Sequence, residues 1–452
     1  MSDRRDTIAA VATGSGRAGI GVIRISGPDV PNISRAILGE PLTARHACYL
    51  PFLSAEDQPL DVGIAIRFEA PNSYTGEDVL ELQGHGGPVV LDLVLARVLE
   101  CGARAARPGE FTERAFLNDR MDLAQAEAVA DLIDSNSKSA AQAAVRSMSG
   151  EFSKAVYGIR DELIALRVWL EAALDFSEEE IDFLSDPELK DRTSRLIQRF
   201  DDLIANASQG QKLRDGLSVV IAGVTNVGKS SLLNALSGSD TAIVTDIAGT
   251  TRDVLHTELL IDDVPMHVID TAGLRSTDDV VEQEGIRRAE RAVESADHVL
   301  VVVDASRPEL PELDQRIDAP CTYVLNKVDL LAAADPIAVV ANTLPIDATA
   351  SVVALSAKTG EGLAELKQHL LSLAGQDRSL EGIYLARRRH LEGLHTAQAS
   401  TERALEHLQT GALPELAAEE LRLGLQALDD ITGRFDSEDL LGEIFSSFCI
   451  GK

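Results

Sequence analysis

Residues 217–230 read LSVVIAGVTNVGKS, and this stretch decides the fold of the central part of the chain. Its first half is apolar and β-branched, which predicts a buried strand. The second half, from Gly223 to Ser230, has the spacing GxxxxGK[ST], and the SLLNALSG that follows it predicts a helix. A strand, a glycine-containing loop and a helix in this order are typical of a loop that binds phosphate groups.

The residue types of this loop indicate how a nucleotide would be held. The glycines allow backbone N–H groups to wrap around phosphates, Lys229 can reach the β- and γ-phosphates, and the Ser230 hydroxyl can bind Mg²⁺. The loop residues that we expect to contact the nucleotide are Asn226, Val227, Gly228, Lys229, Ser230 and Ser231.

Three further motifs follow predicted strands. They are Asp270-Thr271-Ala272-Gly273, Asn326-Lys327-Val328-Asp329 and Ser356-Ala357-Lys358. Asp270 suits Mg²⁺ through water, and the Asp329 carboxylate can accept hydrogen bonds from guanine N1–H and N2–H, a donor pair that adenine lacks. The Ser356 loop fits the base edge, with a backbone N–H directed toward guanine O6. All four motifs in this order resemble a Ras-like GTPase that selects GTP.

The rest of the chain divides into segments of different character. Residues 1–119 are punctuated by Gly and Pro, with strands expected at 19–25 and 62–68 and a helix at 88–101, which indicates an α+β domain. Residues 120–215 and 375–452 are helical, with helices expected at about 152–174 and 187–208. Residues 216–374 alternate strand and helix, which predicts a mostly parallel sheet. We therefore expect an all-α helical domain interrupted by an inserted α/β P-loop G domain.

Composition limits the possible functions. The 452 residues include 42 Lys and Arg against 73 Asp and Glu, a net charge of −31, and 45% are apolar. This charge argues against a protein that coats nucleic acid or an anionic membrane by itself. The cysteines, Cys48, Cys101, Cys321 and Cys449, have no CxxC spacing, which favours reduced thiols in a cytoplasmic protein. No stretch is apolar enough for a membrane span.

Several longer motifs together resemble a known family, the tRNA wobble-uridine modification GTPases called MnmE or TrmE. These motifs are VIRISG (22–27), GEDVLELQGHGG (76–87), RPGEFTERAFLNDRMDLAQAEAVADLI (107–133), AIVTDIAGTTRD (242–253), DTAGLR (270–275) and CIGK (449–452). The resemblance covers essentially the whole chain. It implies a tetrahydrofolate-binding N-terminal domain that forms a homodimer. It also implies an FAD-binding partner of the MnmG (GidA) type and a tRNA substrate held mainly by that partner.

The same resemblance implies the reaction. The two proteins would add a carboxymethylaminomethyl or aminomethyl group to C5 of the wobble uridine. The one-carbon unit would come from a folate such as 5-formyltetrahydrofolate or methylene-tetrahydrofolate. The sequence leaves open which amine is incorporated.

GTP hydrolysis needs a further explanation, because many such GTPases have Gln after DTAG and this chain has the apolar Leu274. The resemblance implies that K⁺ replaces the arginine finger and that Glu282 positions water. The K⁺ ligands would be Asn226, Thr245, Ile247 and Thr250, and Mg²⁺ would be bound by Ser230 and Thr251. The nucleotide-binding loop would comprise Thr245, Asp246, Ile247, Ala248, Gly249, Thr250 and Thr251, with Arg252, Asp253 and Arg275 in supporting roles.

For folate, the resemblance points to Arg24, Glu81, Arg120 and Lys452. A carboxylate such as Glu81 can accept from pterin donors, and a glutamate tail suits Arg or Lys. Cys449 fits either a functional thiol near the folate or a small buried group. The chain departs from the family pattern at TGSGR (13–17), at Thr225 and at Arg120, where Lys is common.

Two other functions fit a GTPase with these motifs. One is a ribosome-assembly GTPase, which usually carries a basic RNA-binding module that we do not find here. The other is a signalling switch that binds effectors when loaded with GTP. Each charged residue named above, Glu282 included, also fits an ordinary surface position.

Overall fold

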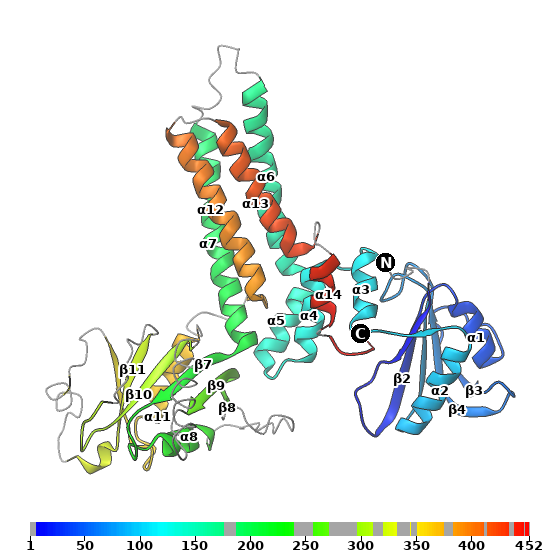
Figure 1. Ribbon diagram of the computed structural model, residues 1–452, viewed down its shortest axis with the longest axis horizontal. Helices are drawn as coiled ribbons and strands as arrows, with labels where there is room; N and C mark the ends of the chain where they lie inside the picture. The colour runs from blue at the N-terminus through cyan, green and yellow to red at the C-terminus, as the bar shows by residue number, and fades with distance from the viewer. Residues whose placement is uncertain are drawn as a thin grey trace, which may run out of the picture. The chain divides into compact units, whose positions relative to one another are not determined.

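The computed structural model describes residues 6–175, 187–238, 256–270, 296–310, 320–331, 344, 350–374, 383–410, 414–433, 438–446 and 448–451. These residues form two compact units (Figure 1). The first draws on residues 1–133, 145–200 and 392–452, and the second on 134–144 and 201–391. In both units, segments that are far apart in sequence pack together, because a helical domain is interrupted by an inserted domain.

A six-stranded sheet forms the N-terminal domain, in the order β3-β4-β5-β2-β1-β6. The strands are β1 (Ile8–Val11), β2 (Ala18–Ser26), β3 (Cys48–Leu53), β4 (Pro59–Phe68), β5 (Val79–Gly86) and β6 (Arg104–Ala105). All neighbours pair antiparallel except β1 and β6. The two strands predicted from the sequence lie within β2 and β4, so those predictions are confirmed.

Two helices pack against this sheet, α1 (Val30–Leu38) and α2 (Pro88–Glu100). Pro88 stands in the first turn of α2, where its missing N–H costs nothing, and Gly102 follows the helix with φ +109°. Their buried side chains share one hydrophobic core with the sheet, which includes Ile33, Val94 and Leu80. The expected α+β domain is thus confirmed.

A charged network joins α3 (Glu110–Leu117) to the edge of the sheet. The Arg114 guanidinium lies 2.6 Å from Asp6 and 3.1 Å from Glu77, and Arg104 lies 2.7 Å from both Asp6 and Glu110. Burial raises the pKa of Glu110, but hydrogen bonds from Arg104 and from the Arg107 backbone outweigh burial and hold this pKa below its usual range. The network therefore stays ionised and fixes α3 to the start of β1.

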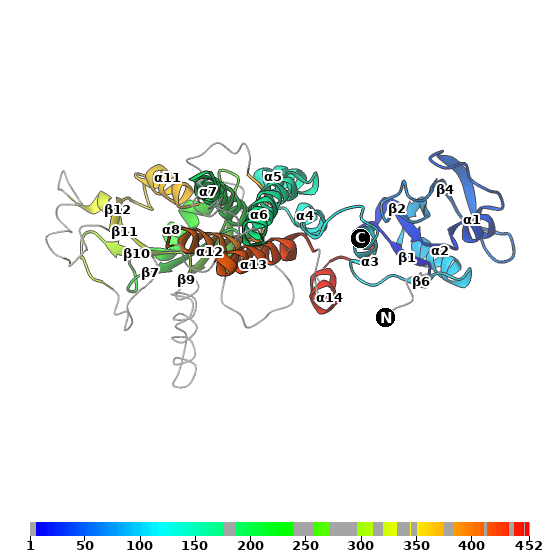
Figure 2. The same cartoon turned by 90° about the horizontal axis from the view of Figure 1, so that it is seen from above.

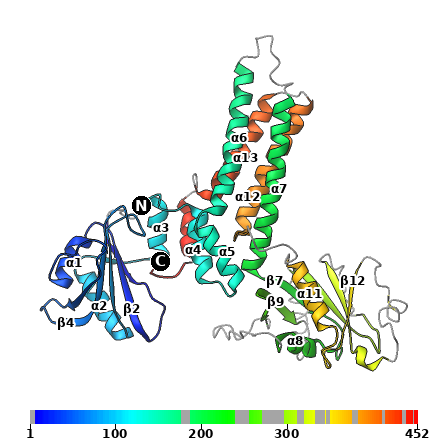
Figure 3. The ribbon, with the colours of Figure 1, turned by 180° about the vertical axis from the view of Figure 1, so that it is seen from behind.

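The helical part consists of α4 (Leu123–Ile133), α5 (Lys138–Met148), α6 (Glu151–Asp175), α7 (Pro187–Asp215), α12 (Arg388–Thr410), α13 (Pro414–Thr432) and α14 (Glu438–Ser446). Within the first unit, α6 and α13 pack side by side (Figure 3). No helix in the described part of the chain is long and apolar enough to cross a membrane.

Helix α7 corrects one prediction from the sequence. The sequence pattern predicts its end near residue 208, just before Gly210, but the helix continues to Asp215. A Cβ at position 210 would collide with the carbonyl of Tyr384, so the glycine permits a close approach of two chain segments and does not end the helix. Leu213, farther along, is buried at 2% exposure, and this burial supports the longer helix.

The C-terminal segment packs against the N-terminal domain within the first unit. Phe445 and Phe448 are buried in a cluster with residues of α4. The Gly109 N–H donates to the Cys449 carbonyl at 3.3 Å, and Gly451 lies so close to the Val11 carbonyl that a Cβ would clash. Cys449 itself is exposed, so of the two environments considered for it the buried one is not observed.

The inserted domain is built on a second sheet, ordered β12-β11-β10-β7-β9-β8. Its strands are β7 (Leu217–Ala222), β8 (His256–Ile261), β9 (Val264–Asp270), β10 (His298–Asp304), β11 (Cys321–Asn326) and β12 (Ser351–Ala354). All pair parallel except β8 with β9, so the predicted mostly parallel sheet is confirmed. Helix α8 (Lys229–Ser237) follows β7, and α11 (Leu363–Leu373) covers one face (Figure 2).

The turn between β8 and β9 contacts the first turn of helix α5, which belongs to the same unit. Asp263 accepts hydrogen bonds from the backbone N–H groups of Lys138 at 2.9 Å and Ser139 at 2.7 Å, and from the Ser139 hydroxyl at 2.7 Å. The Ser137 hydroxyl accepts from the Ala140 N–H at 3.1 Å. The N–H groups at the start of α5 are thus satisfied partly by a residue of the inserted domain.

Candidate nucleotide site and N-terminal cavity

The nucleotide motifs meet because the strands that carry them end at the same edge of the sheet. In the pairing register, Ala222 lies opposite Val301, Asp304 opposite Asn326, and Leu325 opposite Ala354. The loops that begin after Ala222, Asn326 and Ala354 therefore gather at the carboxyl ends of parallel strands, which is where open α/β sheets bind ligands.

The phosphate-binding loop needs its two glycines for steric reasons. A Cβ at Gly223 would lie 2.5 Å from the Val302 carbonyl oxygen, and one at Gly228 would lie 2.4 Å from the Asn326 side chain. Gly228 also has φ +101° as the N-cap of α8, a conformation that favours glycine. The loop can therefore approach β10 and β11 closely and still open directly into a helix.

Lys229 and the first turn of α8 are positioned for phosphate. The Lys229 ammonium donates to the carbonyls of Gly223 at 2.7 Å and Val224 at 2.9 Å, which places its charge inside the loop. Ser230 and Ser231 are exposed in the first turn of the helix. The N-terminus of a helix supplies backbone N–H groups and a positive dipole end to an anion.

Asn326 ties three motifs together. Its side-chain NH₂ donates to the Val227 carbonyl at 2.9 Å, and its side-chain oxygen accepts from the backbone N–H groups of Lys327 at 2.8 Å and Ala357 at 3.0 Å. The residue is 1% exposed. In this geometry Asn326 joins the phosphate-binding loop to the Ser356 loop, and the Ala357 N–H is used for this connection.

Lys327 makes a second connection to the phosphate-binding loop. Its ammonium donates to the Asn226 carbonyl at 2.6 Å and to the Asp304 carboxylate at 2.6 Å. Burial raises the pKa of Asp304, but hydrogen bonds from Lys327 and Ser306 outweigh it, so the pKa lies below its usual range. Asp304 is a site residue that was not predicted, although its position at the end of the apolar strand 299–303 was a usable signal.

The acceptor for the base is held in place by a buried hydroxyl. The Ser356 side chain, fully buried, donates to Asp329 Oδ1 at 2.7 Å, and Asp329 itself is exposed. This bond fixes the plane of the carboxylate and leaves its second oxygen available to accept from a donor on the base. Lys358 is exposed beside it. This arrangement suits a guanine edge.

Several predicted residues lie outside the described part of the chain. These are Thr245, Asp246, Ile247, Ala248, Gly249, Thr250, Thr251, Arg252, Asp253, Thr271, Ala272, Gly273, Leu274, Arg275, Glu282 and Lys452. Asp270 ends β9 opposite Ile221 in the register, so its backbone reaches the same edge as the phosphate-binding loop. The K⁺ and water-positioning assignments stay predictions.

A pair of histidines, the buried His298 of β10 and the half-buried His369 of α11, lies at the opposite end of these strands. The Thr322 hydroxyl is hydrogen-bonded to His298 Nε2 at 2.8 Å and to His369 Nε2 at 2.7 Å. Burial, assisted by the nearby His369, lowers the pKa of His298 to about 4, and burial also lowers the pKa of His369. At neutral pH both rings are uncharged.

This pair predicts an acid sensitivity of the inserted domain. The pKa of His298 is about 4 in the folded chain against 6.5 in its ordinary state, so the unfolded chain binds more protons between these values. The contribution of His298 to the free energy of unfolding is therefore fully present above pH 6.5. It falls by up to about 3 kcal/mol as the pH drops toward 4. We expect His298→Gln to reduce the loss between pH 7 and pH 5.

The measurement is thermal unfolding of the full chain, reading the transition that GDP raises, because ligand binding stabilises the domain that holds the ligand. His395→Gln, at an exposed position of α12, is the matched control and should behave as the wild type. An equal pH dependence in wild type and His298→Gln would contradict the prediction.

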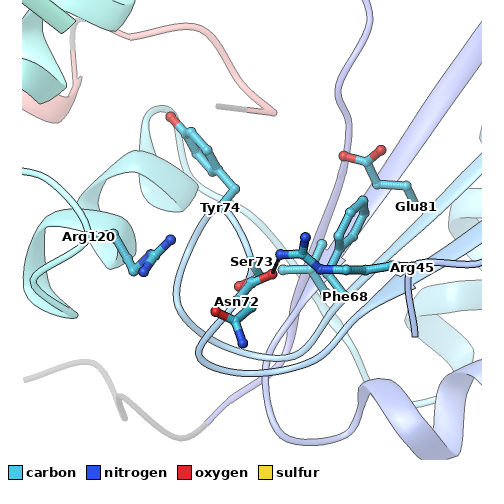
Figure 4. Close-up of a pocket in the computed structure, with 8 residues that line it drawn as sticks. Arg45, Phe68, Asn72, Ser73, Tyr74, Glu81 and Arg120 are labelled. Atoms are coloured by element: carbon cyan, nitrogen blue, oxygen red, sulfur yellow. Dashed lines mark hydrogen bonds between the residues drawn. The ribbon is translucent and has the colours of Figure 1, made fainter. Parts of the chain in front are cut away.

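A second candidate site lies in the N-terminal domain. It is a cavity of about 250 Å³ (Figure 4) lined by Arg45, Phe68, Asn72, Ser73, Tyr74, Val79, Glu81 and Arg120. Two predicted folate residues, Glu81 and Arg120, are therefore brought to one cavity. Phe68 and Tyr74 give it aromatic walls.

Arg24, the third predicted folate residue, does not line this cavity. Opposite Glu81 in the strand register, it donates to that carboxylate through Nε at 3.0 Å and Nη2 at 2.9 Å. Its guanidinium lies over the rings of Tyr74, 5.2 Å from the centroid, and Phe111, 5.8 Å from the centroid. In this geometry Arg24 orients Glu81 and neutralises its charge.

The chain matches two family models. One is described as the GTP-binding protein TrmE N-terminus and matches residues 7–120, and the other as the MnmE helical domain and matches residues 123–449. The tRNA modification GTPase MnmE of Ectopseudomonas mendocina (strain ymp) is 54% identical over 462 residues, which cover 100% of both chains. The protein of that name from Pseudomonas aeruginosa (strain UCBPP-PA14) is 52% identical over 464 residues, again covering 100% of both. The chain belongs to the MnmE family of tRNA modification GTPases.

Solved structures give weaker matches to this MnmE-family chain. A variant of Era from Aquifex aeolicus bound to GDP·AlF₄⁻ has 27% identity and a TM-score of 0.29, covering 40% of this chain and 66% of that one. The G domain of the T. maritima FeoB iron transporter has 26% identity and a TM-score of 0.27, covering 35% and 98%. The family assignment depends on the full-length relatives and the family models.

Three residues that shape the two sites of this MnmE-family chain were not predicted from its sequence. Asp304 binds Lys327, Tyr74 lies against the Arg24 guanidinium, and Arg45 lines the N-terminal cavity. Burial raises the pKa of Tyr74, whose hydroxyl shares a hydrogen bond of 2.8 Å with Thr112. Tyr74 lies in the segment between β4 and β5, and Arg45 in the segment between α1 and β3, where a one-dimensional pattern contains no signal of which side chains meet.

Proposed function

We propose that this chain is a K⁺-stimulated GTPase that acts with an FAD-binding partner of the MnmG type. Together they add a carboxymethylaminomethyl or aminomethyl group to C5 of the wobble uridine of certain tRNAs. The observation that carries the nucleotide part is the hydrogen bond from Ser356 to Asp329, which orients a carboxylate for a guanine edge. The tRNA part is supported by the names of relatives that match over the full length.

In the nucleotide reaction, the backbone N–H groups of residues 226–231 and the Lys229 ammonium bind the phosphates. Lys229 offsets negative charge on the β- and γ-phosphates, and Ser230, with Thr251, holds Mg²⁺. Mg²⁺, when bound there, would neutralise negative charge on the β- and γ-phosphates as the γ-phosphate is transferred to water and GDP leaves. Glu282 orients the attacking water, and Asp270 holds the metal through water. The donor set, a serine hydroxyl at the end of a phosphate-binding loop, suits a hard cation that prefers oxygen.

K⁺ is proposed as a second cation, held by Asn226, Thr245, Ile247 and Thr250. A cation beside the phosphates stabilises the charge that develops in the transition state, a task for which Leu274 offers no group. Asn226 has φ +65°, and its carbonyl already accepts from Lys327 at 2.6 Å, so its backbone is fixed beside the phosphate-binding loop. This preorganisation supports a role for the Asn226 side chain in binding the cation.

The N-terminal cavity is proposed as the folate site. Glu81 accepts from the donors of the pterin ring, Arg120 binds carboxylate, and Lys452 joins them from the C-terminal segment. The approach of Gly451 to the Val11 backbone supports this last assignment, because the segment reaches the strand that pairs with β2. Cys449, exposed in the same segment, is proposed as a functional thiol.

The net charge of −31 supports a division of labour between two proteins. An acidic chain binds tRNA weakly by itself, so a basic partner holds the tRNA while this homodimer supplies folate and GTP-driven movement. Attraction to that partner should fall as the salt concentration rises.

The experiment that tests the function is nucleoside analysis of tRNA from a strain that lacks this protein. We expect the C5 substituents of the wobble uridine to disappear and to return when the wild-type chain, but not Glu282→Ala, is supplied. Glu282→Asp, which keeps the carboxylate, is the matched variant for partial recovery. Unchanged tRNA nucleosides together with accumulation of ribosome precursors would refute the proposal in favour of a ribosome-assembly GTPase.

A further inference from the structure

The charges around the N-terminal cavity do not cancel. Three charged residues line it, Arg45, Glu81 and Arg120. Glu81 is already neutralised, because Arg24 binds it through two nitrogens. Within the described residues, the structure shows no ion pair for either Arg45 or Arg120. The cavity therefore presents two uncompensated guanidinium groups, which favour a ligand with more than one negative charge.

Arg45 is held in a fixed position at this cavity. Its backbone has φ +60°, and its N–H donates to the Arg67 carbonyl at 2.7 Å. Its guanidinium donates to the Asn72 carbonyl at 2.9 Å through Nη2 (Figure 4). A guanidinium has five N–H donors, so most of them stay available for a ligand. Preorganisation of this kind lowers the entropy that binding must overcome.

Arg120 is placed by a different contact. Its aliphatic carbons pack on Gly76, where a Cβ would lie 3.2 Å from Arg120 Cγ. The two arginines thus come from separate segments, Arg45 from the region before β3 and Arg120 from the end of the α3 region, and both reach the cavity that Phe68 and Tyr74 line. Aromatic walls with two guanidinium groups suit an aromatic ligand that carries carboxylates.

We propose that Arg45 determines specificity in this site by binding a carboxylate of the glutamate tail of folate. The proposal deepens the folate assignment and rests on it. Arg45 and Arg120 then share the two carboxylates of one glutamate, and the site selects glutamylated folates over folates without the tail. Arg24 contributes only by orienting Glu81.

The test is isothermal titration of the full chain in a two-by-two design. The proteins are wild type and Arg45→Gln, and the ligands are 5-formyltetrahydrofolate and 5-formyltetrahydropteroate, which lacks the glutamate. We expect the wild type to prefer the glutamylated ligand. We expect Arg45→Gln to lose about tenfold in affinity for that ligand, the effect of one charge-assisted hydrogen bond, with little change for the pteroate.

Two further variants make the result specific. Arg35→Gln, at an exposed position of α1, removes an equal charge away from the cavity and should bind both ligands as the wild type does. Arg45→Lys keeps the charge without the planar fork and should recover part of the preference. It also replaces Arg45→Gln in the comparison if that variant fails to fold.

The outcomes separate the inference from the folate assignment. Equal weakening of both ligands by Arg45→Gln, or no weakening, overturns the role of Arg45 while folate binding stands. Absence of heat with either ligand, in wild-type protein that binds GTP, overturns the folate assignment and the inference together. A wild type that does not distinguish the two ligands also overturns the inference.

Discussion

Replacement of Asp329 by Asn is expected to lower the affinity for GTP by at least about 10³-fold. In the proposed site the carboxylate would accept from two neighbouring donors of guanine, and Ser356 donates to Oδ1 at 2.7 Å and fixes its orientation. In the variant, the oxygen of the amide takes the Ser356 hydrogen bond, so the NH₂ group faces the guanine donors. Two donors then oppose each other, and the base loses its partner.

The same substitution should raise the affinity for xanthosine triphosphate, which has a carbonyl where guanine has its amino group. Fluorescence titration with both nucleotides measures the change in preference. Ser356→Ala is the matched control, because it removes the orienting hydroxyl but keeps the carboxylate, and we expect it to cost about tenfold for GTP. Binding of GTP by Asp329→Asn within about threefold of the wild type would show that Asp329 does not recognise the base.

Hydrolysis of GTP is expected to be about 10²-fold faster in KCl than in NaCl at the same concentration. A cation beside the phosphates offsets the charge that develops in the transition state, and a cation site sized for K⁺ holds Na⁺ poorly. Leu274 cannot orient water, so in the proposed mechanism hydrolysis would depend on this charge more than in a GTPase with Gln at that position. Asn226→Ala should remove most of the difference between the two salts.

Single-turnover hydrolysis measures this effect without a contribution from product release. GDP affinity should be nearly the same in the two salts, which separates a catalytic effect from a binding effect. Glu282→Ala provides the contrast, since it should slow hydrolysis in both salts. Equal rates for the wild type in KCl and NaCl would rule out the cation mechanism.

Much of the inserted domain could be predicted because its signals are local. The loop 223–230 carries its own glycines, and the strand segments 217–222 and 299–303 are almost entirely apolar. The ion pair between Lys327 and Asp304 could not be predicted from such local signals. It depends on the register of β10 and β11, which places Asp304 beside Asn326. Pairing between strands is set by the tertiary structure, and a single sequence contains no direct record of it.

The N-terminal cavity also depends on contacts that could not be predicted from the sequence. Motifs predict Glu81 and Arg120, which line one cavity, but Arg24, predicted for the same ligand, is bound to Glu81. A motif indicates that a charged residue matters without indicating which neighbour it binds. Arg45 lies outside every motif, and only the contact with Asn72 and the lining of the cavity identify it.

The contact of Asp263 with helix α5 couples the movement of this helix to that of strand β9. The strand that ends at Asp270 begins at Val264, directly after the residue that caps the helix. If this strand slides along its own axis, it must either carry the first turn of α5 with it or break the cap, at a cost of about 1 kcal/mol. As long as the hydrogen bonds of Asp263 are kept, strand β9 and the first turn of α5 move together. A displacement of this strand of the inserted domain is therefore transmitted to the first turn of α5.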